Sequence, residues 1–297
     1  MGWQGAVRLG FHVPVSRGLV HAARHARAIG CECLQVFVRN PRGWRARSYP
    51  EAEVQAFREL VVELKLGPLV VHSCYLANLA SPNAELLARS RAAVADDLAR
   101  AGRLGAAVVC VHAGHHMGAG PEAGLATLAD SVRGLLDLSP PGVGLLLENG
   151  AQRGRELGSE WGQLARVLAL TGGDERLGVC FDTCHAHAAG YRLDGPRRVG
   201  RTLREVERTV GLDRVRLIHL NDCRSAPGSG RDRHEHLGKG SIGAVGLSAL
   251  LRRPELQRLC AILETPIARA DDDARNLRRA RRLMVRPRGR RRSGVGA

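Results

Sequence analysis

Residues 177–182 read LGVCFD, a short and mostly apolar run that ends on an aspartate. The run is too short for a helix, and it does not alternate apolar with polar positions as a half-exposed strand would. This pattern is typical of a strand buried on both faces of a parallel sheet. Seven further runs of this kind occur at residues 7–13, 33–38, 69–72, 107–112, 142–148, 215–220 and 260–264. The sequence therefore predicts eight buried parallel strands.

Segments rich in Ala, Leu and Arg separate these runs and carry apolar residues at helical spacing. In residues 85–104, one helical face collects Leu87, Val94, Leu98, Ala101 and Leu104, and Gly105 follows as a stop signal. Eight strand–helix units predict an α/β fold in which a closed parallel barrel is ringed by helices. An open, doubly wound sheet is the alternative.

Polar side chains stand where the apolar runs end. In chain order these ends are His12, Arg39 with Asn40, His72, His112, Glu148, Asp182, His219 and Glu264. An open sheet would gather such groups mainly at one switch point, whereas a barrel brings the carboxyl end of every strand to one mouth. We therefore expect the barrel, with the functional site at its mouth.

The residues at six of these ends suggest bound metal. Three histidines, two glutamates and one aspartate packed into one basin would be costly without cations. His185, Asp232 and His234 from nearby segments add three donors to these six. The candidate ligands are therefore His72, His112, Glu148, Asp182, His185, His219, Asp232, His234 and Glu264. Nine nitrogen or carboxylate donors are too many for one tetrahedral ion and suit two or three, with zinc favoured and manganese or iron as alternatives.

Charge indicates the kind of partner. The 297 residues include 45 Lys and Arg against 29 Asp and Glu, a formal net charge of +16, which predicts a polyanionic partner. Several metal ions in a basic protein point to phosphoester hydrolysis. Aromatic residues make up only 3% of the chain, which argues against a base-stacking platform. No apolar run is long enough for a membrane span, so we expect a cytoplasmic protein with no membrane partner.

The chain is expected to form one catalytic domain over residues 1–275, followed by an arginine-rich tail at 276–297 that is disordered. Its eight cysteines show no C-x-x-C spacing, so we expect them to be small core residues rather than a disulfide framework or a zinc ribbon.

Longer motifs resemble the endonuclease IV family of apurinic/apyrimidinic endonucleases. They are VHSCYLANLA (71–80), VHAGHH (111–116), LLLEN (145–149), GVCFDTCHAHAAGY (178–191), IHLNDCRSAPGSGRDRHEHLGKGSIG (218–243) and ILETP (262–266). The resemblance implies a TIM-type (β/α)8 barrel with three zinc ions that cuts double-stranded DNA on the 5′ side of an abasic site. The products would be a 3′-hydroxyl and a 5′-deoxyribose phosphate, and removal of 3′ blocking groups is also implied.

The resemblance also assigns residues to roles. The ligands carried over by motif are His72, His112 and a bridging Glu148 for the first zinc, Asp182, His219 and Glu264 for the second, and His185, Asp232 and His234 for the third. Glu148 and Glu264 are the expected catalytic carboxylates. Arg42, in the loop at 40–44, corresponds to the side chain that fills the gap in the duplex. Tyr75 and Leu76, which follow His72, correspond to the pair inserted beside the extruded nucleotide. A monomer associated with the nucleoid through DNA is expected.

Some positions depart from the family pattern. Ala113 stands where the family usually has proline, which predicts a looser loop beside His112, and His12 is not a family ligand. The arginine tail has no family counterpart, so it either adds DNA affinity or is dispensable. Two other functions stay open: a sugar isomerase or epimerase on the same barrel with one divalent ion, and a non-catalytic nucleic-acid-binding protein that uses the tail.

Overall fold

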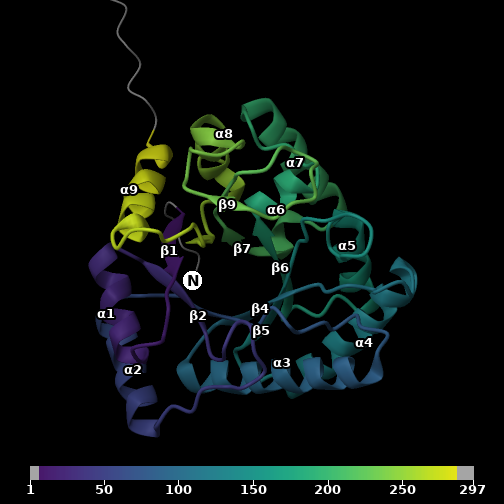
Figure 1. The fold of residues 1–297 in the computed structure, drawn as a ribbon, viewed down its shortest axis with the longest axis horizontal. Coiled ribbons are helices and arrows are strands. Elements are labelled where there is room, and N and C mark those ends of the chain that lie inside the picture. Colours follow the sequence, from purple (N-terminus) through teal and green to yellow (C-terminus); the bar gives the residue numbers. More distant parts are fainter. Residues whose placement is uncertain (1–6, 286–297) are drawn as a thin grey trace, which may run out of the picture.

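The computed structural model describes residues 7–285 and contains a closed barrel of eight parallel strands (Figure 1). The barrel strands are β1 (Arg8–His12), β2 (Cys33–Phe37), β3 (Leu69–His72), β4 (Val108–His112), β5 (Gly144–Glu148), β6 (Leu177–Asp182), β7 (Val215–His219) and β10 (Cys260–Leu263). Each lies within one of the eight apolar runs. Because β1 pairs with both β2 and β10, the sheet closes on itself. The predicted (β/α)8 barrel is therefore confirmed, and the open sheet is wrong.

Helices surround the barrel as the apolar spacing predicts (Figure 1). They are α1 (Leu19–Ile29), α2 (Glu51–Glu63), α3 (Ala84–Leu104), α4 (Pro121–Leu138), α5 (Trp161–Leu170), α6 (Thr183–Ala188), α7 (Pro196–Thr209), α8 (Gly243–Leu251) and α9 (Asp272–Met284), with short 3-10 turns η1 (Leu212–Arg214) and η2 (Pro254–Leu256). Asn83 caps α3 by accepting a 2.8 Å hydrogen bond from the amide of Leu86. Gly105 ends that helix with a φ of 74°, a conformation that glycine adopts without strain.

Cysteines fill part of the barrel interior beneath the mouth. One buried cluster combines Cys33, Cys110, Cys180 and Cys260 with Val70, Leu146, Leu217 and Ile262. The four cysteines come from β2, β4, β6 and β10, which are alternate strands of the barrel, as in the layered packing of such barrels. All eight cysteines are free and buried, so their prediction as small core residues is confirmed.

The segment between β7 and α8 contains a small antiparallel pair, β8 (Asp222–Cys223) and β9 (His234–Glu235). One prediction about the end of the chain needs correction. The boundary between a domain ending at 275 and a disordered tail is wrong, because α9 continues to Met284 with Leu277 and Ala280 buried.

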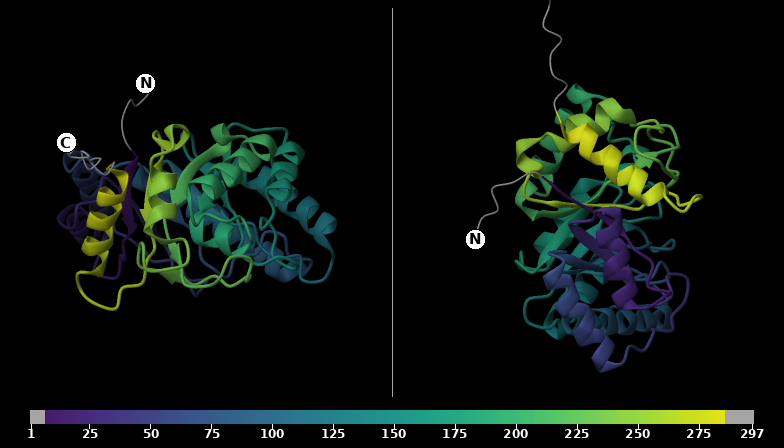
Figure 2. Two further views of the ribbon diagram at one scale, coloured as in Figure 1. Left: turned by 90° about the horizontal axis from the view of Figure 1, so that it is seen from above. Right: turned by 90° about the vertical axis from the view of Figure 1, so that its left-hand side faces the viewer.

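Helix α9 packs beside β1, α1 and α8, so the end of the described chain lies next to its beginning (Figure 2). Residues 286–297, the rest of the predicted tail, lie outside the described residues. Within residues 7–285, every helix is too short or too polar to cross a bilayer.

Candidate metal centre

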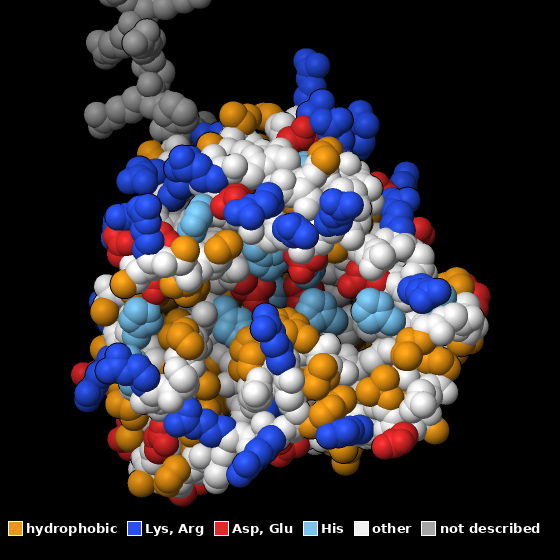
Figure 3. Space-filling model, in the orientation of Figure 1, with side chains coloured by type: hydrophobic (Ala, Val, Ile, Leu, Met, Phe, Trp, Pro, Cys, Tyr) orange, Lys and Arg blue, Asp and Glu red, His pale blue; other side chains and the backbone are white. Residues whose placement is uncertain are grey.

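The carboxyl ends of the strands bring most of the predicted site residues to one mouth. The last residues of their strands are His12, His72, His112, Glu148, Asp182 and His219, and Glu264 directly follows β10. On this face of the molecule, histidine and acidic side chains share a central hollow, and Lys and Arg side chains stand around it (Figure 3).

The second strand differs from the prediction. Arg39 is buried, but it donates from Nε to Asp97 on α3 at 2.6 Å and from Nη2 to the carbonyl of Ala93 at 2.8 Å, so it braces α3 and does not join the mouth. Gln35 on β2 takes the place at the mouth. Its Nε2 donates to Glu264 Oε1 at 2.8 Å, and its Oε1 accepts from His219 Nε2 at 2.9 Å.

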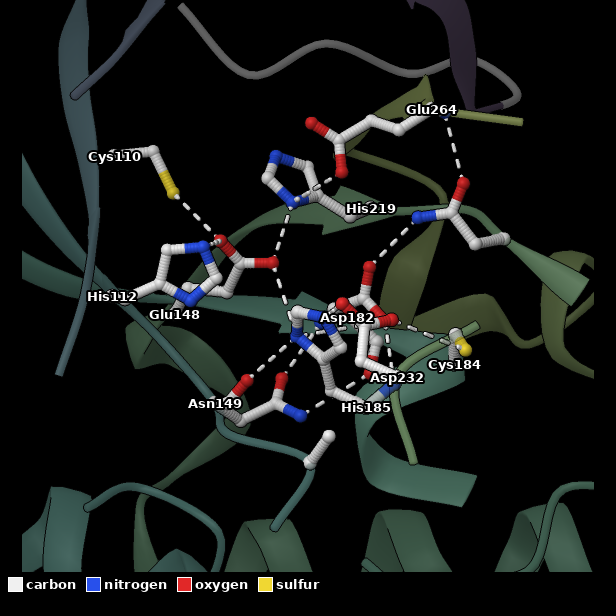
Figure 4. Close-up of polar contacts among 12 residues, drawn as sticks. Cys110, His112, Glu148, Asn149, Asp182, Cys184, His185, His219, Asp232 and Glu264 are labelled. Carbon is white, nitrogen blue, oxygen red and sulfur yellow. Dashed lines mark hydrogen bonds and ion pairs between the residues drawn. The ribbon is translucent and has the colours of Figure 1, made fainter. Parts of the chain in front are cut away.

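Glu148 stands at the centre of the cluster (Figure 4). Its Oε2 lies 3.1 Å from His72 Nε2 and 3.7 Å from His112 Nε2. Its Oε1 lies 2.9 Å from His219 Nδ1 and 3.3 Å from His185 Nδ1. With only 1% of the residue exposed, this carboxylate can bridge donors on both sides of the mouth.

A second group of donors lies beside the first. His185 Nε2 is 3.2 Å from Asp232 Oδ2, and His234 Nε2 is 3.2 Å from Asp232 Oδ1 and 3.8 Å from Asp182 Oδ2. His234 Nδ1 donates to the carbonyl of Glu264 at 3.1 Å, which orients the ring. Its Nε2 is buried and makes no hydrogen bond within residues 7–285, so a lone pair is available there for a cation.

These donors fit bound divalent metal. One set of ligand atoms within 4.8 Å of one another comes from Glu148, Asp182, His219 and Glu264, and another from Asp182, His185 and His234. Two further sets also include a thiol, with Cys110 beside His72, Glu148 and His219, and Cys184 beside Asp232 and His234. Imidazole, carboxylate and thiol donors at this spacing suit zinc, and several overlapping sets suit more than one ion.

Two of the central groups, His112 and Glu148, are in forms that can ligate a cation. Burial opposes protonation of His72, but contact with Glu148 outweighs burial and raises the pKa of His72 to about 9, so His72 must lose a proton when a cation binds. Burial lowers the pKa of His112 to about 4, so this imidazole is neutral. Burial alone would raise the pKa of Glu148, but the imidazoles of His219 and His112 outweigh burial and hold the pKa well below its usual range. Divalent metals bind ionised carboxylates and neutral imidazoles.

Several amide side chains that the sequence analysis missed orient the ligands. Asn149 accepts from the amide of Asp182 at 2.7 Å, and Asn221 donates to Asp182 Oδ2 at 2.7 Å. Asn221 also accepts from the amide of Glu264 at 2.9 Å. Both asparagines follow a strand end by one or two residues, a position that could have identified them.

His12 has a defined place in this network. Its Nδ1 lies 3.0 Å from Glu264 Oε1, so it positions a candidate ligand from β1. Ala113 is buried and Gly114 has a φ of 88°. The loop that follows is tied down, because Asn78 accepts from the amide of His115 at 2.9 Å. A loose loop beside His112 is therefore not observed.

The three residues expected to contact DNA lie on loops at the mouth. Arg42 is exposed, and Tyr75 and Leu76 are 54% and 38% exposed. The amide of Tyr75 donates to the carbonyl of Pro41 at 2.9 Å, which joins the two loops. The Tyr75 ring packs edge-on against Phe37 and lies 5.9 Å from the ring of His112. The Tyr75 ring therefore stands beside the donor cluster, and the loop that carries Arg42 lies next to it.

Comparisons with known proteins agree with this arrangement. Residues 23–286 match the model of the xylose isomerase-like TIM barrel family. "Probable endonuclease 4" of Methanoculleus marisnigri is 41% identical over 278 residues, which are 93% of this chain and 99% of that protein. The crystal structure of endonuclease IV from Thermus thermophilus superposes with a TM-score of 0.82 at 38% identity, over 93% of this chain and 98% of that one. A D-tagatose 3-epimerase-like protein, with a TM-score of 0.69 and 17% identity over 92% of this chain and 96% of that one, shares the fold alone.

Proposed function

Because this chain belongs to the endonuclease IV family, among the xylose isomerase-like TIM barrels, we propose that it is a zinc-dependent DNA repair endonuclease. It hydrolyses the phosphodiester on the 5′ side of an abasic site in double-stranded DNA and leaves a 3′-hydroxyl and a 5′-deoxyribose phosphate. It also removes 3′ blocking groups. It acts as a monomer in the cytoplasm, where its DNA substrate associates it with the nucleoid.

The position of Glu148 is the observation that carries this proposal. Its two oxygens lie against imidazoles from β3 and β4 on one side, and from β7 and α6 on the other. A buried carboxylate in this place can hold two cations close together, which is the arrangement that two-metal phosphodiester hydrolases use.

We assign three zinc ions to these donors. The assigned ligands are His72, His112 and Glu148 for the first ion, Glu148, Asp182, His219 and Glu264 for the second, and His185, Asp232 and His234 for the third. Zinc bound there supplies water activation at neutral pH and neutralisation of phosphate charge.

The protein's own side chains hold and orient the reacting groups. Glu148 and Glu264 are the catalytic carboxylates. Gln35 and His12 both contact Oε1 of Glu264 and fix its rotamer. Because these two contacts hold Oε1, the other carboxylate oxygen, Oε2, points towards His219 and lies 3.4 Å from its Nδ1.

Tyr75, Leu76 and Arg42 act on the duplex. The exposed apolar surface of Tyr75 and Leu76 can wedge between base steps, and the guanidinium of Arg42 can replace the missing base. An abasic nucleotide has no base to unstack, so its extrusion towards the mouth costs less than that of an intact nucleotide. This difference provides part of the selectivity for the lesion.

Metal content and nicking together test the proposal. Purified protein should contain about three zinc ions per chain and nick a duplex that carries one abasic site. Chelation should abolish nicking, and added zinc should restore it. A single manganese or magnesium ion, together with turnover of a ketose sugar, would instead support the isomerase alternative. Nicking by protein shown to be free of metal would contradict the assignment.

A further inference from the structure

A basic groove lies outside the metal centre, between α9 and the segment that follows β9. Its volume is about 630 Å³, and its lining includes His236, Lys239, Arg269, Arg275, Arg279 and Arg282. Among the described residues of the lining, Asp272 alone carries a carboxylate. Lys and Arg side chains are gathered over α9 on the face that also presents the mouth (Figure 3).

The helix explains why these charges stand together. Arg275, Arg279 and Arg282 are four and three residues apart, so they share one face of α9. Leu277 and Ala280 are buried. The seven residue-to-residue steps from Arg275 to Arg282 rise by about 10 Å along the helix axis. The arginines therefore form a row along the groove.

Much of this positive charge is not neutralised within the protein. The Asp272 carboxylate already accepts from the backbone amides of Ala268 and Arg269, at 3.0 and 2.7 Å. Arg275 pairs with Asp271 at 2.7 Å, and Arg279 donates weakly to the carbonyl of Gly238 at 3.4 Å.

The remaining cations of the groove are free to bind a partner. Among residues 7–285, the exposed side chains of Lys239, Arg269 and Arg282 form no hydrogen bond or ion pair with the protein. Cations without partners in the protein suit a polyanion.

We propose that this groove binds the phosphate backbone of the DNA duplex beyond the nucleotides held at the mouth, an inference that rests on the proposed function. One segment connects the two places: Asp232 and His234 belong to the metal centre, and Lys239 lines the groove. A duplex strand that crosses the mouth can therefore continue into the groove. A row of about 10 Å matches roughly three phosphates at the 3.4 Å rise of one strand.

The chemistry of the lining predicts how the groove binds DNA. Apart from His236, its described lining residues carry no aromatic ring that could stack on a base. Contacts to phosphate fix the position of a duplex but carry no sequence information. The groove should therefore strengthen binding to long duplexes of any sequence.

The salt dependence of binding tests this inference in the full-length protein. The test variant is Lys239→Gln/Arg269→Gln/Arg282→Gln, which leaves Arg275 and Arg279 with their protein contacts. The matched control is Arg58→Gln/Arg166→Gln/Arg208→Gln, which removes the same charge from exposed side chains on α2, α5 and α7. Binding is measured between 50 and 200 mM salt on two duplexes with one central abasic analogue, of about 30 and about 10 base pairs.

On the long duplex, the test variant should bind about ten-fold more weakly, and the slope of log affinity against log salt should fall by about 2, since each phosphate contact contributes about 0.9. On the short duplex it should bind like the wild type, with unchanged zinc content and melting temperature. The control should bind the short duplex with the same affinity as the test variant. On the long duplex, its slope of log affinity against log salt should be steeper than that of the test variant.

Equal slopes for the test variant and the wild type on the long duplex would overturn the inference. Equal losses on both duplexes would also overturn it, because the three side chains would then act at the mouth. Nicking by the wild-type protein reports separately on the proposed function. If the wild type nicks but the slopes agree, only the groove fails; if the slopes differ without nicking, the groove stands and the proposed activity fails.

Discussion

Gln35 and Glu264, 229 residues apart in the chain, are joined by a 2.8 Å hydrogen bond from Nε2 to Oε1 at the mouth of the barrel. The same glutamine accepts from His219 through Oε1 at 2.9 Å. It therefore fixes the position of His219, at the end of β7, relative to that of Glu264, which directly follows the neighbouring strand β10. Like Asn149 and Asn221, this uncharged residue thus helps to organise a centre whose candidate ligands are acids and imidazoles.

Replacing this glutamine should weaken metal binding without unfolding the barrel. Gln35→Leu removes these two hydrogen bonds and the 2.9 Å contact with His12 Nδ1 while nearly keeping the volume. Loss of such an orienting partner typically lowers metal affinity by about 10- to 100-fold. Competition with a zinc chelator measures the change. Gln55→Leu on the exposed face of α2 is the matched control and should bind zinc like the wild type. Wild-type zinc affinity in Gln35→Leu would show that the contact does not position the ligands.

The central carboxylate gives the sharpest test of catalysis. Glu148→Ala should lower the rate of nicking by at least about a thousand-fold, because no other carboxylate in the described chain lies between the two groups of imidazoles. Binding to the abasic duplex should stay measurable, since Tyr75, Leu76 and Arg42 are untouched. Single-turnover cleavage and anisotropy separate the two effects. Glu122→Gln, at an exposed position on α4, should cleave normally, and normal turnover in Glu148→Ala would remove the bridging role.

The fold was predictable because strands buried on both faces leave continuous apolar runs in the sequence. In the barrel, each run also ends at the mouth, so the residue type at its end shows the chemistry of the site. His72, His112, Glu148, Asp182 and His219 are each the last residue of a strand. Reading the ends of the runs was therefore enough to bring these side chains together.

Other parts could not be predicted from the same pattern. Arg39 and Gln35 both belong to the region of β2, but only the strand register shows which of them reaches Glu264. Helix α9 is rich in arginine and buries few apolar side chains, among them Leu277 and Ala280, so its composition resembles that of a disordered tail. Packing against β1, α1 and α8 stabilises this helix, and composition does not reveal such packing.

A buried carboxyl away from the metal centre should make stability depend on pH. Burial raises the pKa of Asp97 from its ordinary value of 3.8 to about 6, although Arg39 and Ser73 act in the opposite direction. The folded protein then holds this proton more tightly than the unfolded chain. The associated stability is fully present below about pH 4 and is lost as the pH rises through 6.

The size of this loss follows from the shift. Relative to Asp97→Asn, the free energy of unfolding of the wild type should fall by about 2 kcal/mol between pH 4 and pH 6.5, at about 1.4 kcal/mol for each pKa unit. The asparagine keeps an acceptor for Arg39, which also stays paired with Asp96 at 2.8 Å. Urea unfolding at several pH values measures the difference. Parallel curves for the two proteins would show that Asp97 has an ordinary pKa.

Two truncations separate the structural role of α9 from that of the residues after it. Ending the chain after Pro266 removes α9 and exposes the surface that Leu277 and Ala280 bury. It also removes Asn276, which accepts from the amide of Leu237 at 3.0 Å and so braces the segment next to His234. We expect a loss of at least about 3 kcal/mol of stability, since burial of one leucine contributes about 2 kcal/mol and the hydrogen bonds add to it. Zinc content should fall as well.

Ending the chain after Val285 keeps α9 and every contact just described. This variant should melt at the wild-type temperature, bind the same amount of zinc and nick an abasic duplex, because the metal centre and the loops at the mouth are intact. Calorimetry, metal analysis and a nicking assay on both truncated chains make the comparison. Equal stability and equal activity of the two truncated chains would contradict this prediction. The contacts of Asn276 and Leu277 in α9 would then add nothing to the free energy of unfolding.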